Sequence, residues 1–217
     1  MSVPKPPWIE ITTIVPCPIR CSYCPQDTLI ASYQGEGVLT LSRFAEVLKN
    51  ISRDVTIDFS GFAEPFTNPE CADMILLGHE LGYKIGVNST LVGLGEKNAQ
   101  RIAHIPFAFF YQHDIGLDLP VYPFVERRSK VENPESRSGN LRPELRREGV
   151  GECKRSPTHE INVMLPDGTV VLCCNDYGLK HCLGNLFNTR YEQLTREVDY
   201  ELCHRCPHWA QTGEIAK

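Results

Sequence analysis

No stretch of this 217-residue sequence approaches the roughly 18 consecutive apolar residues that a membrane-spanning helix needs. No succession of basic, apolar and small residues opens the chain either, so a secretory signal peptide is not predicted. Basic blocks are missing too, and 22 Lys and Arg against 27 Asp and Glu give a net charge of −5. That balance argues against a nucleic-acid backbone as the partner. We therefore expect no nucleic-acid partner and no membrane partner.

Cysteine, by contrast, is abundant. The ten cysteines could form the disulfide framework of a secreted protein, but most of them are grouped as a CxxxCxxC run, a Cys-Cys pair and a CxxC pair. Such grouping is typical of metal ligation in a reducing compartment. The sequence therefore predicts metal-binding cysteines and a cytoplasmic localisation.

The first half of the chain alternates strand and helix patterns. Compact β-branched segments predict strands, whereas apolar residues at helical spacing, together with capping and stop residues, predict helices. The expected strands are 8–14, 55–59, 83–88 and 106–111, and the expected helices are 41–51, 69–81 and 96–104. This alternation predicts parallel βαβ units, whose functional residues lie after the carboxyl ends of the strands.

Residues 114–150 break this rhythm with several prolines and a charged run, so a full eight-unit barrel does not fit before residue 150. We predict an α/β fold in which residues 1–150 form an open partial (β/α) barrel of about five to six parallel strands. Residues 151–217 are expected to form a smaller C-terminal module, with a hairpin of strands 161–165 and 169–173 and a helix at 191–198.

Cys17, Cys21 and Cys24 follow the first predicted strand on one short loop. Three thiolates can each hold one iron of a four-iron, four-sulfur cluster, which leaves the fourth iron open for a substrate or cofactor. A structural zinc site is the alternative, but it requires four ligands, usually as two CxxC pairs, and the gaps in this run fit that pattern poorly. The spacing therefore favours an open iron–sulfur cluster.

This spacing, with the aromatic residue Tyr23 before the third cysteine, resembles the radical S-adenosylmethionine enzymes. The resemblance implies that the open iron chelates the amino and carboxylate groups of S-adenosylmethionine. It implies that an electron then cleaves this cofactor to a 5'-deoxyadenosyl radical, which abstracts a hydrogen atom from a C–H bond. It also implies an external electron donor such as flavodoxin or ferredoxin.

Polar residues after the second and third predicted strands extend the resemblance. Gly61 and Glu64 are similar to the Gly-Gly-Glu motif of the family, with Ala63 in place of a glycine, and imply a contact with the amino group of the cofactor. A glycine turn with a solvated Glu is the alternative reading of this segment. Asn88 and Ser89 lie where the family has polar residues for the cofactor, although they could equally cap a loop. The cofactor-binding candidates are therefore Tyr23, Gly61, Glu64, Asn88 and Ser89.

A second set of cysteines lies towards the end of the sequence. The pattern Cys-x14-Gly-x4-Cys followed by CxxC resembles the twitch domain, a shortened relative of the SPASM domain, and implies a second four-iron cluster that is fully ligated by cysteine. A zinc site at the same residues is the alternative. Cys174 or Cys182 could serve as an alternative ligand, and Cys71 is expected to be a packed thiol on a helix and Cys182 a thiol in a loop. The expected ligands are Cys153, Cys173, Cys203 and Cys206, with Gly168 in the spacer.

Gln112 and His113, after the fourth predicted strand, and Arg137, before the C-terminal module, complete the set of candidates. They are similar to elements of the butirosin-pathway radical dehydrogenases, which oxidise an aminocyclitol alcohol. That resemblance implies that Arg137 faces the substrate and assists deprotonation of its hydroxyl group. A surface arginine and a structural histidine are the alternatives. The catalytic candidates are thus Arg137, His113 and Gln112.

The function that follows is oxidation of a small alcohol, such as a cyclitol or sugar, with the second cluster as the electron acceptor. A second hypothesis is a peptide-modifying maturase, an epimerase or cross-linker acting on a short peptide. The first strand begins at Trp8, which we expect to leave no room for a leader-peptide-binding domain. A third hypothesis is a non-enzymatic iron–sulfur or zinc protein for electron transfer or binding, which needs neither Glu64 nor an open iron.

Overall fold

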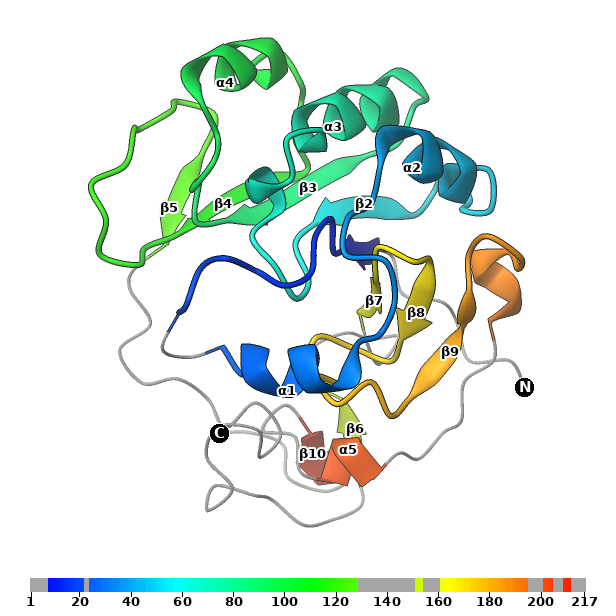
Figure 1. Ribbon diagram of the computed structural model, residues 1–217. Helices are drawn as coiled ribbons and strands as arrows, with labels where there is room; N and C mark the ends of the chain where they lie inside the picture. The colour runs from blue at the N-terminus through cyan, green and yellow to red at the C-terminus, as the bar shows by residue number, and fades with distance from the viewer. Residues whose placement is uncertain are drawn as a thin grey trace.

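The computed structural model describes residues 8–21, 24–128, 151–153, 161–194, 201–204 and 209–211 (Figure 1). Its main sheet has eight strands in the order β5-β4-β3-β2-β1-β7-β8-β9 and is not closed. The six strands from β5 to β7 pair in parallel, and β8 and β9 continue the sheet antiparallel. This confirms the open, mostly parallel α/β sheet. The strands are β1 (Trp8–Ile11), β2 (Thr56–Phe59), β3 (Ile85–Ser89), β4 (Phe109–His113), β5 (Glu126–Arg128), β7 (Asn162–Met164), β8 (Thr169–Val171) and β9 (Cys182–Asn185).

Helices cover the two faces of the sheet unequally. Three of them, α2 (Leu41–Leu48), α3 (Cys71–Glu80) and α4 (Glu96–Ile102), lie side by side on one face, and α1 (Gln26–Ser32) lies across from them (Figure 1). Short elements complete the described chain: the 3-10 turns η1 (Pro65–Thr67) and η3 (Tyr191–Gln193), the helix α5 (Glu201–His204), and the antiparallel pair β6 (Gly151–Cys153) and β10 (Trp209–Gln211). None of the helices described is long and apolar enough to cross a membrane.

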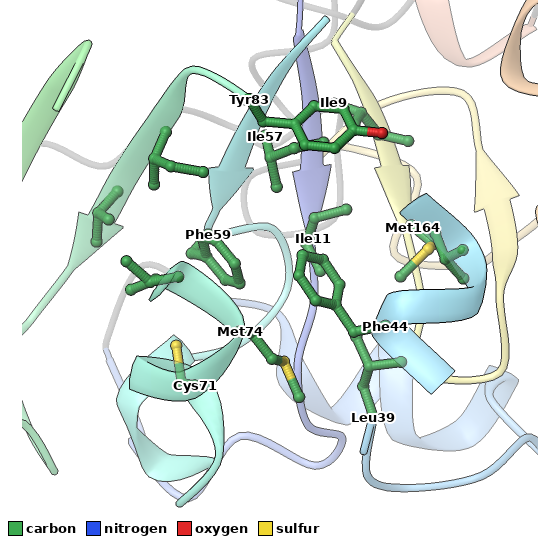
Figure 2. Close-up of a cluster of buried hydrophobic side chains, with 14 of the residues drawn as sticks. Ile9, Ile11, Leu39, Phe44, Ile57, Phe59, Cys71, Met74, Tyr83 and Met164 are labelled. Carbon is green, nitrogen blue, oxygen red and sulfur yellow. The ribbon is translucent and has the colours of Figure 1, made fainter. Parts of the chain in front are cut away.

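The main hydrophobic core lies between the sheet and helices α2 to α4. Alternate residues of β1 and β2, among them Ile11 and Phe59, point towards the helices because successive side chains of a strand face opposite sides. Phe44 of α2 is fully buried against Phe59, with ring centroids 5.6 Å apart. Figure 2 shows Cys71 in the same core, which confirms the expected packed thiol on a helix.

Local signals in the sequence explain the start of α2 and the end of α3. The Thr40 side chain accepts a hydrogen bond from the backbone N–H of Arg43, as expected for the cap of α2. Gly82 follows α3 with a φ of +84°, the left-handed conformation that a helix-ending glycine adopts readily. The strand predicted at 106–111 is observed as β4, which lies further along the chain, from Phe109 to His113. The predicted helix 191–198 begins as the turn η3, and residues 195–200 lie outside the described residues.

The C-terminal hairpin is continuous with the barrel sheet. Strand β7 pairs in parallel with β1 and antiparallel with β8, and the turn between β7 and β8 contains Gly168 at a φ of +83°. Cys182 was expected in a loop, but it begins β9, which pairs antiparallel with β8. The predicted boundary between residues 150 and 151 adjoins residues 129–150, which are outside the described part of the chain.

Candidate functional site

One cavity of about 210 Å³ lies at the carboxyl ends of β1, β2, β3 and β4, among the last residues of these strands and the loops that follow them. These strands run in parallel, so their carboxyl ends and the side chains that follow them gather at one edge of the sheet. The cavity thus brings together eight of the predicted site residues, and Thr90 and Tyr177 with them. The eight are Cys17, Cys21, Cys24, Gly61, Glu64, Asn88, Ser89 and His113.

The cysteine loop is attached to the loop after β2 by the buried side chain of Gln26. Its Oε1 accepts from the backbone N–H of Cys17 at 3.4 Å, and its Nε2 donates to the backbone carbonyl of Phe62. The same Nε2 lies 3.6 Å from the Sγ of Cys24. Gln26 therefore contacts both ends of the motif, Cys17 to Cys24, and orients it towards the cavity.

All three thiols of the motif are half-buried at the cavity wall. The Sγ of Cys17 accepts a hydrogen bond from the backbone N–H of Glu64 at 3.3 Å. Burial raises the pKa of the Cys17 thiol above its ordinary value of 9.0, against the opposing effect of the backbone N–H groups of Glu64 and Ile19. Ligation by iron favours the thiolate and would reverse this shift.

The donor set fits an iron–sulfur cluster. Three soft thiolates from one loop are the ligands that such clusters take, and the cavity beside them leaves space for a further ligand. Within the described ranges, no three His, Cys, Asp or Glu side chains converge on a single metal-ion position. A cubane cluster does not require that convergence, because each thiolate binds a different iron.

Glu64 is buried beneath the cavity, with an exposed fraction of 5%. Its Oε1 accepts from the Phe66 backbone N–H at 3.2 Å and from the Ser89 hydroxyl at 2.6 Å. Its Oε2 accepts from the backbone N–H and the hydroxyl of Thr90, at 2.6 and 2.7 Å. Burial raises the pKa of the Glu64 carboxyl above its ordinary value of 4.5, although the hydrogen bonds from Ser89 and Thr90 oppose this effect.

This hydrogen bonding refines the expected role of Glu64. A carboxylate offers about four acceptor positions, and four protein donors already approach the two oxygens. Glu64 is therefore not the solvated residue of a simple glycine turn, and it joins the loop after β2 to the loop after β3. Either hydroxyl can rotate away, so an ammonium group could replace it as a donor without leaving a backbone N–H unpaired.

Gly61 is required at the exit of β2 by its conformation and its surroundings. Its φ is +80°, and a Cβ atom on this residue would lie 2.4 Å from the Oγ1 of Thr12. The same Oγ1 accepts a hydrogen bond from the backbone N–H of Phe62. Gly61 thus allows the loop that carries Glu64 to approach the end of β1 closely.

Asn88 and His113 belong to a hydrogen-bonded chain across three strands. The Nδ2 of Asn88 donates to the buried carboxylate of Asp58, at 3.1 and 3.2 Å to its two oxygens, and the Ser60 hydroxyl donates to Asp58 at 2.9 Å. The Oδ1 of Asn88 lies 3.3 Å from the Nε2 of His113. Because the amide oxygen only accepts, this contact places a proton on the Nε2 of His113.

Gln112 lies on the opposite face of β4 from His113, as neighbouring residues of a strand do. Its side chain is buried with an exposed fraction of 2% and is not among those that line the cavity. We expected Gln112 and His113 to enter the same site from a loop. Both residues lie inside β4 instead, so their side chains face opposite sides, and the prediction is wrong for Gln112.

The second set of cysteines is only partly described. Cys173 is half-buried, while Cys174 packs in a hydrophobic cluster with Phe62 and Tyr177, which leaves Cys173 as the better placed of the pair. Cys203 is buried in α5, and Cys153 ends β6. Cys206 lies outside the described residues, as do Tyr23 and Arg137. The four-cysteine site therefore stays a prediction.

Sequence reasoning missed Gln26 and Tyr177 and did not select Thr90. Gln26 begins α1, a helix for which no side-chain cap is present, and Tyr177 contacts Cys24 across 153 positions of sequence. Thr90 directly follows two residues that were selected, so its position after β3 was the available signal.

Among the solved structures that resemble this chain are two of BtrN, and both matches cover most of its length. The crystal structure of BtrN in complex with AdoMet and 2-DOIA matches with a TM-score of 0.70 and 16% sequence identity, and the match covers 89% of this chain and 83% of BtrN. The crystal structure of SeMet BtrN in an OPEN conformation matches with a TM-score of 0.63, also at 16% identity, over 88% of this chain and 80% of that one. The chain therefore has the fold of BtrN, a butirosin radical SAM dehydrogenase. No protein-family model and no curated protein matches the chain by sequence.

Proposed function

We propose that this protein is a radical S-adenosylmethionine enzyme. The observation that carries the proposal is the cavity itself, where Cys17, Cys21 and Cys24 meet the loop of Glu64 at the carboxyl edge of a BtrN-like sheet. Three thiolates from the loop after β1 would hold a four-iron cluster with one open iron. When bound there, the cluster and S-adenosylmethionine together supply a 5'-deoxyadenosyl radical that abstracts hydrogen.

The residues around the cavity would position the cofactor and keep water out. Glu64, with Ser89 and Thr90, forms a polar wall beside the cysteine loop, at the place proposed for the amino group of S-adenosylmethionine. Asn88 lines the same cavity one strand further on and would face the ribose. Phe62 and Ile19 add apolar surface, which favours the dry surroundings that radical chemistry needs.

The substrate class that we propose is a small alcohol, such as a cyclitol or sugar. Support comes from the fold of BtrN and from His113 at the cavity, whose Nε2 is directed at Asn88. Because the Nε2 of His113 carries a proton in this contact, its Nδ1 would receive or relay the proton of the substrate hydroxyl, and Arg137 would assist that deprotonation. Cys153, Cys173, Cys203 and Cys206 would hold a second cluster that accepts the remaining electron.

The decisive experiment is anaerobic reconstitution of the full chain, followed by iron analysis and incubation with S-adenosylmethionine and a reductant. We expect about eight irons per chain from two four-iron clusters and the release of 5'-deoxyadenosine. Replacing Cys17, Cys21 and Cys24 with Ala should leave about four irons and abolish that release. A triple variant that keeps the full iron content would refute the assignment of these ligands.

A further inference from the structure

Tyr177 joins the connection between β8 and β9 to the cysteine loop. It follows Cys173 and Cys174 in the connection between β8 and β9, and its side chain is 3% exposed. The ring packs against Phe62, with centroids 4.7 Å apart, inside a hydrophobic cluster that includes Leu29 of α1. The position of the Tyr177 ring is therefore set by packing on several sides.

The hydroxyl of Tyr177 lies 3.6 Å from the Sγ of Cys24. A thiolate that binds iron carries no proton, so the hydroxyl is the donor in this pair. The Nε2 of Gln26 lies at the same distance from the same sulfur. Exchanging the positions of the Gln26 amide oxygen and nitrogen would break two hydrogen bonds, because the oxygen accepts from the backbone N–H of Cys17 and the nitrogen donates to the backbone carbonyl of Phe62. Cys24 thus has two side-chain donors.

The turn that carries Tyr177 is itself held by hydrogen bonds. The backbone N–H of Asp176 donates to the carbonyl of Cys173 at 3.0 Å. The buried carboxylate of Asp176 accepts from the backbone N–H groups of Lys180 and His181, at 3.1 and 2.9 Å. The hydroxyl of Tyr177 is therefore placed by the same turn that presents Cys173.

We propose that Tyr177 is a positioning residue that donates a hydrogen bond to the thiolate of Cys24 and raises the reduction potential of the first cluster. This inference rests on the proposed function, since it requires a cluster at Cys17, Cys21 and Cys24. Reduction adds negative charge that is shared by the ligating sulfurs, so a donor on one sulfur stabilises the reduced state more than the oxidised state. The connection between β8 and β9 then contributes to how easily the first cluster is reduced.

The test is a redox titration of the reconstituted full chain, followed by electron paramagnetic resonance. The first cluster is identified as the component whose signal changes when S-adenosylmethionine is added. The two proteins are compared at the midpoint potential of the wild-type first cluster. At that potential, the ratio of reduced to oxidised first cluster in Tyr177→Phe should be about tenfold lower than in the wild type. This corresponds to a midpoint potential that is about 59 mV lower for a one-electron reduction. Tyr33→Phe is the matched control, because the Tyr33 hydroxyl bonds to Glu36 and Asp167 rather than to a cysteine, and its ratio should not change.

A second variant covers the case in which Tyr177→Phe fails to fold or to hold iron. Site-specific replacement of Tyr177 with 3-fluorotyrosine keeps the ring and strengthens the donor, so the potential should shift in the opposite direction. An unchanged potential in a folded Tyr177→Phe, or in the fluorinated protein, would overturn the inference and leave the proposed function intact. A wild-type protein without any signal that responds to S-adenosylmethionine would reject the proposed function and this inference together.

Discussion

Replacing Thr90 with Val removes one defined hydrogen bond from the buried carboxylate of Glu64. The hydroxyl of Thr90 donates to Oε2 at 2.7 Å, and valine keeps nearly the same shape without that donor. A hydrogen bond to a charged group contributes about 1.5–3 kcal/mol, so the free energy of unfolding should fall by about that amount at pH values above the folded pKa of Glu64. Thr90→Ser keeps the hydroxyl and is the matched control, with an expected loss of less than half as much.

The loss should depend on pH in a defined direction. Burial already raises the pKa of Glu64 above 4.5, so its ionisation opposes folding as the pH rises from about 4.5 through the folded pKa. Removing a donor that favours the ionised form raises that pKa further. The difference in the free energy of unfolding between the wild type and Thr90→Val should therefore be small near pH 4.5 and grow as the pH rises towards neutral.

Urea denaturation of the two variants and the wild type, followed by circular dichroism at several pH values between about 5 and 8, measures these differences. Equal stability of Thr90→Val and Thr90→Ser at neutral pH would show that the hydroxyl does not hold an ionised Glu64. A difference that stays constant with pH would point to packing of the Thr90 side chain as the cause.

Three further predictions concern cofactor binding, the second cluster and the core. Glu64→Gln should weaken S-adenosylmethionine binding by about 1.5–3 kcal/mol in calorimetry, and unchanged binding together with unchanged cofactor cleavage would exclude a role for Glu64. Joint replacement of Cys203 and Cys206 with Ala should stop ketone formation while slow release of 5'-deoxyadenosine continues, provided that circular dichroism shows a folded protein; oxidation at the wild-type rate would contradict an electron-accepting cluster. Phe44→Ala should lower the free energy of unfolding by about 3–5 kcal/mol, because Phe44 is fully buried against Phe59, and a loss below about 1 kcal/mol in urea would contradict that packing.

Elements with local signals could be predicted from the sequence, and those without them could not. Helix α2 begins after the capping residue Thr40, and helix α3 ends before Gly82. Both helices were expected close to their observed bounds. Strand β5 was missed because all three of its residues are exposed, so no hydrophobic pattern marks it and only its pairing with β4 defines it. Strand β9 contains Gly184 at a φ of +145°, which also hides it from a propensity argument.

The candidate site shows the same division. The spacing of the cysteines and the position of Glu64 after a strand were sufficient to predict that these residues meet. The partners that hold them in place could not be predicted, because Tyr177 reaches Cys24 only through the tertiary fold. Gln112 was assigned to the cavity because the end of β4 was placed two residues too early, and a shift in strand bounds changes which side chains count as loop residues.

The pairing of β1 with β7 has a consequence for how the protein is made. Strand β1 lies between β2 and β7, so Ile9 and Ile11 receive their second neighbours, Asn162 and Met164, from far along the chain. During synthesis, the edge of β1 that faces β7 cannot form its backbone hydrogen bonds until these residues have left the ribosome. Until then the nascent chain exposes an unpaired strand edge, which invites association with other chains. Coexpression with chaperones that cover exposed strand edges should therefore improve the soluble yield.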